Sequence, residues 1–257
     1  MPEGPDPADW EGHALDCAEC RFAALKAGRQ CGPGWSCAFD RYAPRIARFF
    51  MMNPDAADLC LEAPYSETRA QAARVANLFR LRPLLDDPDA GVRVVAVLRL
   101  PAAQARVALK DPDREVRAAL AWRLPFADLV PLLDDADAHV RQVAARRADP
   151  GVLPMLVRDP DPEIRILVAE RVAPRWLVHL IGDPDPLVRR AVAARLVPEA
   201  LSRLADDPDL RVRHAVAERA GPELAARLLD DSEAPVREAA AARLRELAAE
   251  RDSDVDR

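Results

Sequence analysis

The sequence predicts an all-α solenoid, a stack of short helical repeats, that follows a small cysteine-rich segment. A motif of Asp-Pro-Asp, two further residues, a β-branched residue and Arg recurs every 24 residues from Asp87 onward. The chain has 24 prolines against nine glycines, a ratio that suits a helical protein only if the prolines fall periodically at helix ends. All five cysteines precede residue 61. We therefore divide the chain into a cysteine-rich domain, residues 1–62, and a repeat domain, residues 63–257.

The repeat is regular enough to define columns of equivalent residues. Asp-Pro-Asp occupies five of seven consecutive slots from about residue 87, and Asp135-Ala136-Asp137 and Asp231-Ser232-Glu233 occupy the other two. Seven copies without an insertion indicate a repeat array, and a degenerate eighth copy is expected at residues 63–86, where Arg69 falls in register. Two arginine columns run through the seven copies. The first arginine column is Arg93, Arg117, Arg141, Arg165, Arg189, Arg213 and Arg237, and the second arginine column is Arg99, Arg123, Arg147, Arg171, Arg195, Arg219 and Arg243.

Each repeat is expected to hold one α-helix and one shorter helical segment. Asp111 or Asp113 can cap a helix that runs through Val116 to Leu124, where Pro125 ends it. The segment that follows has at most about eight residues before the next pair of aspartates, which suits a tight turn or a 3₁₀ helix. Neither segment can bury its apolar face alone, so the repeats must stack on one another.

The first arginine column is predicted to form an internal Asp–Arg ladder between the layers. At about 100° of rotation per residue, Arg117 falls inside the apolar arc formed by Val116, Leu120 and Leu124. A buried arginine needs a charged acceptor, and the expected one is the Asp six residues earlier, which is Asp111 for Arg117. The second arginine column lies at the edge of the arc, where a contact with solvent and a contact with a ligand are equally expected.

Four of the cysteines form one cluster in the sequence. Cys17 and Cys20 make a Cys-x-x-Cys pair, Cys31 follows after ten residues, and Cys37 follows after five more. Such a cluster in a cytoplasmic chain suggests metal ligands before disulfides. Four sulfur ligands fit Zn²⁺ and an iron–sulfur cluster equally well, so the spacing alone leaves the metal open. Cys60 lies outside this cluster, and we expect it to be a buried free thiol.

Both parts of the chain resemble one known family. The Cys-x₂-Cys-x₁₀-Cys-Gly-Pro-Gly-x-Ser-Cys motif, followed by Arg45-Ile46-Ala47-Arg48-Phe49-Phe50 and Asn53-Pro54, resembles the iron–sulfur domain that precedes the repeats of leucine-rich repeat variant proteins. The 24-residue repeat resembles the repeats of the same family, and its Asp-Pro-Asp-x-x-Val-Arg motif is also similar to the longer HEAT-like repeats. The resemblance implies a right-handed superhelical solenoid of alternating α and 3₁₀ helices without strands. It also implies one 4Fe-4S cluster, with zinc as the alternative, held by Cys17, Cys20, Cys31 and Cys37.

The sequence favours a binding function over catalysis. No histidine, serine or acidic pair stands in a catalytic setting, and the aspartates recur as helix caps and ladder members. We therefore expect an iron–sulfur-cluster-containing repeat scaffold that binds a protein partner, with a cluster that is redox-active or structural. The alternative is a nucleic-acid-binding HEAT-like solenoid. Residues 63–257 hold 31 basic and 33 acidic residues, so they offer no bulk attraction to phosphate.

Composition also bears on where the protein resides. The formal net charge is −6, and no apolar run approaches the length of about 20 residues that a membrane span needs. The acidic, proline-rich amino terminus is unlike a signal peptide. We therefore expect a soluble cytoplasmic protein without a membrane partner.

Overall fold

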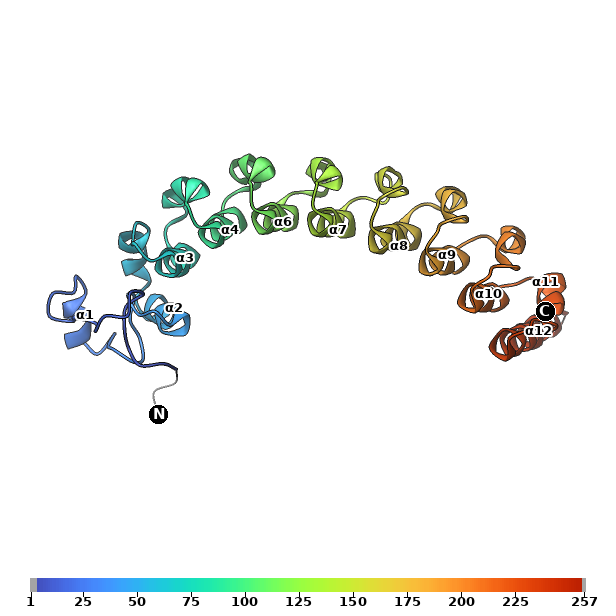
Figure 1. The fold of residues 1–257 in the computed structure, drawn as a ribbon, viewed down its shortest axis with the longest axis horizontal. Coiled ribbons are helices and arrows are strands. Elements are labelled where there is room, and N and C mark those ends of the chain that lie inside the picture. Colours follow the sequence, from blue (N-terminus) through green and yellow to red (C-terminus); the bar gives the residue numbers. More distant parts are fainter. Residues whose placement is uncertain (1–3, 256–257) are drawn as a thin grey trace. The chain divides into compact units, whose positions relative to one another are not determined.

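The computed structural model describes residues 4–255, and helices make up the regular structure of these residues (Figure 1). In this range an isolated β-bridge joins Gly32 to Ser36, and no strand is formed. The predicted all-α class, with alternating α and 3₁₀ helices, is confirmed. None of the described helices is long and apolar enough to cross a membrane. The chain divides into two compact units, Met1–Asp128 and Leu129–Arg257. This division falls inside the repeat array, and the domain boundary at residues 62 and 63 stays a prediction.

In the first unit, α-helices alternate with short 3₁₀ helices, labelled η. Helix α2 packs against α3, α3 against α4, and α4 against α6. A single α-helical turn, α5, takes part of the place of a 3₁₀ helix. The elements are α1 (Ala23–Ala27), α2 (Ala43–Met52), η1 (Pro54–Cys60), α3 (Ser66–Val75), η2 (Leu78–Arg80), η3 (Arg82–Asp86), α4 (Ala90–Arg99), α5 (Ala102–Ala105), η4 (Arg106–Lys110), α6 (Arg114–Arg123) and η5 (Phe126–Asp128).

The second unit continues the same alternation. Helix α7 packs against α8, α8 against α9 and α9 against α10, and the long helix α12 packs against α10 and α11. The elements are η6 (Val130–Asp134), α7 (Ala138–Arg147), η7 (Leu153–Leu156), α8 (Pro162–Arg171), η8 (Pro174–Leu180), α9 (Pro186–Ala193), η9 (Pro198–Leu204), α10 (Leu210–Ala217), α11 (Pro222–Leu228) and α12 (Ala234–Val255).

Two columns of completely buried residues, one from each segment of the repeat, run through the core. The β-branched residue before each arginine of the first column lies on the α-helix, and a leucine of the short segment faces it. Both columns are completely buried, as apolar side chains in a stacked array must be. The α-helical column is Val92, Val116, Val140, Ile164, Val188, Val212 and Val236, and the leucines are Leu81, Leu129, Leu153, Leu177 and Leu201.

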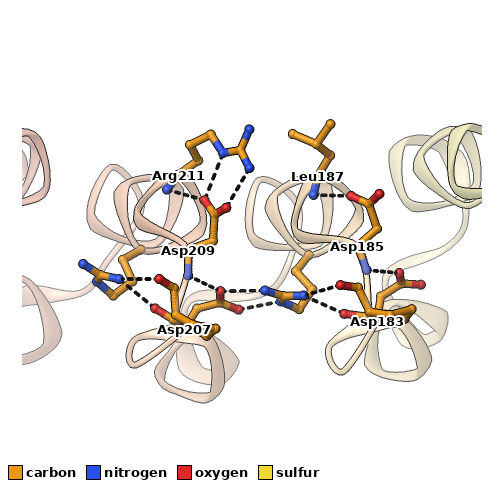
Figure 2. A network of polar contacts seen from close by, with 10 residues as sticks. Asp183, Asp185, Leu187, Asp207, Asp209 and Arg211 are labelled. Carbon is orange, nitrogen blue, oxygen red and sulfur yellow. Dashed lines mark hydrogen bonds and ion pairs between the residues drawn. The ribbon is translucent and has the colours of Figure 1, made fainter.

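The two acidic residues of the Asp-Pro-Asp turn have separate roles. The second Asp caps the α-helix, as Asp185 does when its carboxylate accepts the backbone N–H of Leu187 at 2.7 Å (Figure 2). The first Asp stabilises the turn, as Asp207 does when its carboxylate accepts the backbone N–H of Asp209 at 2.9 Å. Of the two caps considered for the helix through Val116, Asp113 is the N-cap residue. Each turn therefore satisfies helix-end donors that would otherwise lack partners.

The first arginine column forms an internal ladder between the repeats. In six pairs, one of which starts at Arg69 of the degenerate copy, Nε and Nη2 of the arginine donate to both carboxylate oxygens of the Asp 18 residues later, at 2.6–3.0 Å. Nη1 donates to backbone carbonyls of its own turn, as Arg165 does to Asp159 at 2.7 Å and to Pro160 at 3.2 Å. The pairs include Arg69–Asp87, Arg93–Asp111, Arg141–Asp159, Arg165–Asp183, Arg189–Asp207 and Arg213–Asp231.

The prediction that each arginine pairs with the carboxylate of the Asp six residues earlier is wrong. Nη1 of Arg117 donates to the backbone carbonyl of Asp111 at 2.8 Å, whereas the carboxylate of Asp111 accepts from Arg93 of the preceding repeat. The reason is the shape of the turn: the same carboxylate accepts the N–H of Asp113, which leaves the carbonyl of Asp111 as the acceptor for Arg117. Asp111 therefore joins two neighbouring repeats. Its carboxylate accepts from the arginine of the preceding repeat, and its backbone carbonyl accepts from the arginine of its own repeat.

The second arginine column caps the helix of the preceding repeat. Nη1 of Arg195 donates to the backbone carbonyls of Ala169 and Val172, both at 2.8 Å, at the carboxyl end of α8. The last carbonyls of a helix lack intrahelical donors, and a cation there is also favoured by the helix dipole. These half-buried arginines hold the fold together rather than forming a free basic stripe. Equivalent contacts are made by Arg99, Arg123, Arg171, Arg219 and Arg243.

The ladder makes stability depend on pH in the acid range. Hydrogen bonds from Arg213 hold the pKa of Asp231 below its usual value of 3.8. Burial alone would raise the pKa of Asp207, but its bonds from Arg189 and the Asp209 amide outweigh this and lower it. A carboxyl with a lowered pKa in the folded state stabilises the fold above its unfolded pKa and loses that contribution as pH falls. We expect the melting temperature to fall steeply below about pH 4. A melting temperature that stays constant between pH 6 and pH 3 would contradict this.

The helical stack begins inside the cysteine-rich segment. Arg45 of α2 lies 24 residues before Arg69, and α2 packs against α3 as α3 packs against α4. Position 63, where the ladder partner of Arg45 would stand, is Ala63. Arg45 instead forms a buried ion pair with Asp40 at 3.2 Å. The first layer of the array is therefore α2, which belongs to the same segment as the cysteines.

Candidate metal centre

The Cys17–Cys20 pair lies on a turn that Asp16 organises. The Asp16 carboxylate accepts the backbone N–H of Ala18 at 2.8 Å, an arrangement in which an aspartate side chain stabilises a turn. The backbone N–H of Phe22 points at the Sγ atom of Cys20, 3.4 Å away. Hydrogen bonds to the ligand sulfurs are among the contacts with which a protein surrounds an iron–sulfur cluster.

The second pair of cysteines flanks a tight loop. The N–H of Gly32 donates to the carbonyl of Ser36 at 2.7 Å, and this bridge brings Cys31 and Cys37 to the two ends of the loop. Gly34 lies between them with φ of 81°, a left-handed conformation that glycine adopts without strain. The Gly-Pro-Gly sequence therefore serves as the turn that sets the separation of these two thiols.

The structure brings the four predicted ligands into one pocket. All four cysteines are free and partly exposed, whereas Cys60 is free and only 1% exposed, as expected for a buried thiol. Cys60 is not among the residues that line the pocket. The pocket is lined by Cys17, Cys20, Cys31 and Cys37 together with Phe22, Ala23, Lys26, Gly32, Ala38, Phe39 and Phe49. Apart from the cysteines, Lys26 is the only ionisable residue in this lining.

Hydrogen bonds from three side chains connect the pocket to α2, η1 and α3. The amide nitrogen of Asn53 donates to the carbonyl of Phe49 at 3.0 Å, which caps α2, and to that of Gln30 at 3.1 Å, beside Cys31. The hydroxyl of Thr68 in α3 donates to the carbonyl of Ala38 at 2.6 Å, beside Cys37. Nη1 of Arg21 donates to the carbonyl of Leu59 in η1 at 2.9 Å.

The electrostatics of the pocket disfavour four thiolates without a cation. Burial raises the pKa of Cys31, and the neighbouring Cys20 and Cys17 raise it further, against a lowering by Lys26. Burial also raises the pKa of Cys37 to about 11, with further raising by Asp40 and the nearby thiols. A metal or cluster with positive charge compensates this repulsion and displaces the protons.

The donor set fits an iron–sulfur cluster. In the described part of the chain, no three of the cysteine Sγ atoms lie mutually within 4.8 Å. A tetrahedral zinc ion with Zn–S bonds of about 2.3 Å brings its sulfurs to about 3.8 Å from one another. A cluster in which each thiolate binds a separate iron accommodates wider separations. The aromatic lining of Phe22, Phe39 and Phe49 shields such a cluster from solvent.

The sequence predicted the four cysteines of this pocket but not the residues that hold them in place. The buried Arg45–Asp40 pair, Asn53 and Thr68 have no visible role in a single sequence, although Asn53 belongs to the motif that carried the resemblance. For Arg45 the sequence did hold an indication of a structural role, because Arg45 precedes Arg69 by the repeat length of 24 residues.

Comparison with known proteins agrees with this geometry. Residues 7–59 match the family described as LRV protein FeS4 cluster. A solved structure described as a leucine-rich repeat variant with a novel repetitive protein structural motif is 39% identical in sequence to this chain. The two superpose with a TM-score of 0.84 over 90% of this chain and 99% of the chain in that structure. A Rhodobacter capsulatus protein described as an uncharacterized 27.7 kDa protein in the nifB 3' region is 61% identical over 105 residues, or 41% of this chain. The match spans 43% of that relative's length.

Proposed function

The chain belongs to the leucine-rich repeat variant family and carries its iron–sulfur domain, and from this we propose that it is a protein-binding scaffold whose cluster controls the binding state of its repeats. In this proposal one 4Fe-4S cluster is held by Cys17, Cys20, Cys31 and Cys37. When bound, the cluster supplies a one-electron redox centre. The match of residues 7–59 to the FeS4 cluster family supports a cluster over a single zinc ion.

The observation that carries the proposal is the direct contact between the cysteine segment and the array. Helix α2 is the first layer, and Asn53 and Thr68 fix the two ends of the Cys31–Cys37 loop to α2 and α3. Repeat arrays transmit stability between neighbours, and their terminal layers need a cap. Loss of the cluster would release the loop, loosen α2 and expose the apolar face of α3.

The exposed faces of the helices support a protein as the partner. Leu98 on α4 and Trp122 on α6 are 47% and 58% exposed, and these two helices pack against each other. The same repeat position holds Arg146, Glu170 and Ala194 in later repeats, so the fold does not require an apolar residue there. Exposed tryptophan and leucine side chains on adjacent helices are typical of surfaces that bind proteins.

The nucleic-acid alternative loses its main support. It depended on the second arginine column as a basic groove, and guanidinium groups of that column donate to backbone carbonyls. Net charge gives no compensating attraction to phosphate.

Affinity capture with the full chain tests the proposal. We expect holo protein purified anaerobically to retain a protein partner that survives nuclease treatment, and the purified partner to bind the apo chain at least about tenfold more weakly. Cys60→Ser is the matched control, which should bind as the unaltered chain does. Retention of nucleic acid alone, with a strong dependence on salt, would favour the alternative, and equal binding by holo and apo chains would remove the regulatory role.

A further inference from the structure

A groove between α8 and α9 in the second unit carries charges that the fold does not use. Glu163, Ile166 and Glu170 of α8 line one side of it, and Leu187 and Arg190 of α9 line the other. Glu163, Glu170 and Arg190 are exposed, and among the described residues none of them forms an ion pair or a side-chain hydrogen bond. The groove therefore presents unpaired charges of opposite sign on its two sides.

The repeat does not require the two glutamates. At the position of Glu163, one other repeat holds a glutamate, Glu115, and the remaining repeats hold Gly91, His139, Leu187, Arg211 and Pro235. Glu170 lies in the last turn of α8, where the helix dipole disfavours a negative charge. The arginine that caps this end, Arg195, is already engaged with backbone carbonyls. Glu163 lies in the first turn of α8, where the helix dipole favours a negative charge, so a role in stability leaves only Glu170 unexplained.

The distance between the two carboxylates along α8 indicates how far apart complementary charges on a ligand should lie. Glu163 and Glu170 are seven residues apart, which is two turns or about 10.5 Å along the axis of α8. A helix that lies along α8 presents residues i and i+7 at the same spacing on one face. Apolar residues between them, at i+3 and i+4, would cover Ile166 and Leu187.

We propose that this groove binds an amphipathic helix of the protein partner. The helix carries basic residues at i and i+7 facing Glu163 and Glu170, an apolar stripe on Ile166 and Leu187, and an acidic residue facing Arg190. Helix-in-groove recognition uses this combination of apolar anchors and flanking charges, and the two opposite charges fix the orientation of the bound helix. The inference rests on the proposed function, because it names a surface of the scaffold that a protein partner would contact.

Two synthetic peptides of identical composition test the charge pattern against the full holo chain. The first places Lys at i and i+7 along one edge of a leucine stripe and Glu along the other edge, and the second exchanges the Lys and Glu positions. By fluorescence anisotropy, we expect the first peptide to bind at least about fivefold more tightly than the second. Glu163→Gln with Glu170→Gln should abolish this preference, whereas Glu199→Gln with Glu223→Gln, two exposed glutamates elsewhere in the unit, should keep it.

The outcomes separate this inference from the proposed function. Equal binding of the two peptides, or a preference that survives Glu163→Gln with Glu170→Gln, would overturn the assignment of the groove. A captured partner that binds in a cluster-dependent way but ignores Ile166→Asp would also overturn it and leave the scaffold function intact. If the peptide preference is present while the full chain captures no protein, the proposed function fails and the groove assignment stands.

Discussion

Cys20→Ser is expected to abolish the bound cluster, and Cys60→Ser to retain it. Cys20 lines the pocket and accepts a backbone N–H, so its loss removes one of four anchors and leaves an iron without its thiolate. Cys60 is buried outside the pocket. Anaerobic protein should hold about four irons and four sulfides per chain, and Cys20→Ser protein less than about one of each. Iron and sulfide analysis, with the visible absorption spectrum, measures this directly.

Two results would contradict the ligand assignment. If both variants kept their iron, a residue other than Cys20 would be a ligand. Colourless protein with one zinc per chain would show that the site holds a single ion and would contradict the iron–sulfur cluster. Cys31→Ser and Cys37→Ser, at the two ends of the glycine loop, should repeat the loss seen for Cys20→Ser.

Arg165→Met is expected to destabilise the second unit by about 3 kcal/mol or more. The side chains of Arg165 and Asp183 are 10% and 4% exposed, and the arginine bonds to two carboxylate oxygens and two backbone carbonyls. The variant leaves a buried carboxylate without its cation and turns two carbonyls into unpaired acceptors. Denaturation in urea, followed by circular dichroism of the full chain, gives the change in stability.

A second variant and a control make this result interpretable. Arg165→Met with Asp183→Leu removes both charges and should recover part of the loss, since replacement of a whole buried pair costs less than removal of one partner. Arg211→Met removes an arginine of the same unit that binds Asp209 at the surface, and it should leave the midpoint unchanged. A neutral effect of Arg165→Met alone would mean that the ladder contributes nothing to the stack.

The structure of the repeat could be predicted from the sequence because helix-capping and helix-ending residues recur at similar positions in successive repeats. The spacing of proline and the helix cap depend on contacts within one repeat, and seven copies made these and the β-branched column visible. The ladder partner was wrong because it depends on contact between repeats. Asp159 and Asp183 are equally consistent with the sequence as acceptors for Arg165, and only the stacking of α8 on α9 selects Asp183.

The same distinction applies at the cysteine site. The spacing and the family resemblance were sufficient to place four thiols in one pocket, since their positions along the chain are local. The attachment of that pocket to the array was not predictable, because Thr68 and Ala38 are 30 residues apart and their hydrogen bond follows from the packing of α2 on α3. The 24-residue spacing between Arg45 and Arg69 is a feature of the sequence that accompanies the packing of α2 on α3.

Hydrogen–deuterium exchange before and after removal of the cluster tests most directly whether the cluster supports the first layer of the array. Measured on the full chain, the backbone amides of α2, η1 and α3 should lose protection when the iron is chelated, because Asn53 and Thr68 then hold a loop without its anchor. The amides of α8 to α10 should keep their protection, since stability in an array depends on nearest neighbours. Unchanged protection across α2 and α3 in the apo chain would contradict the account.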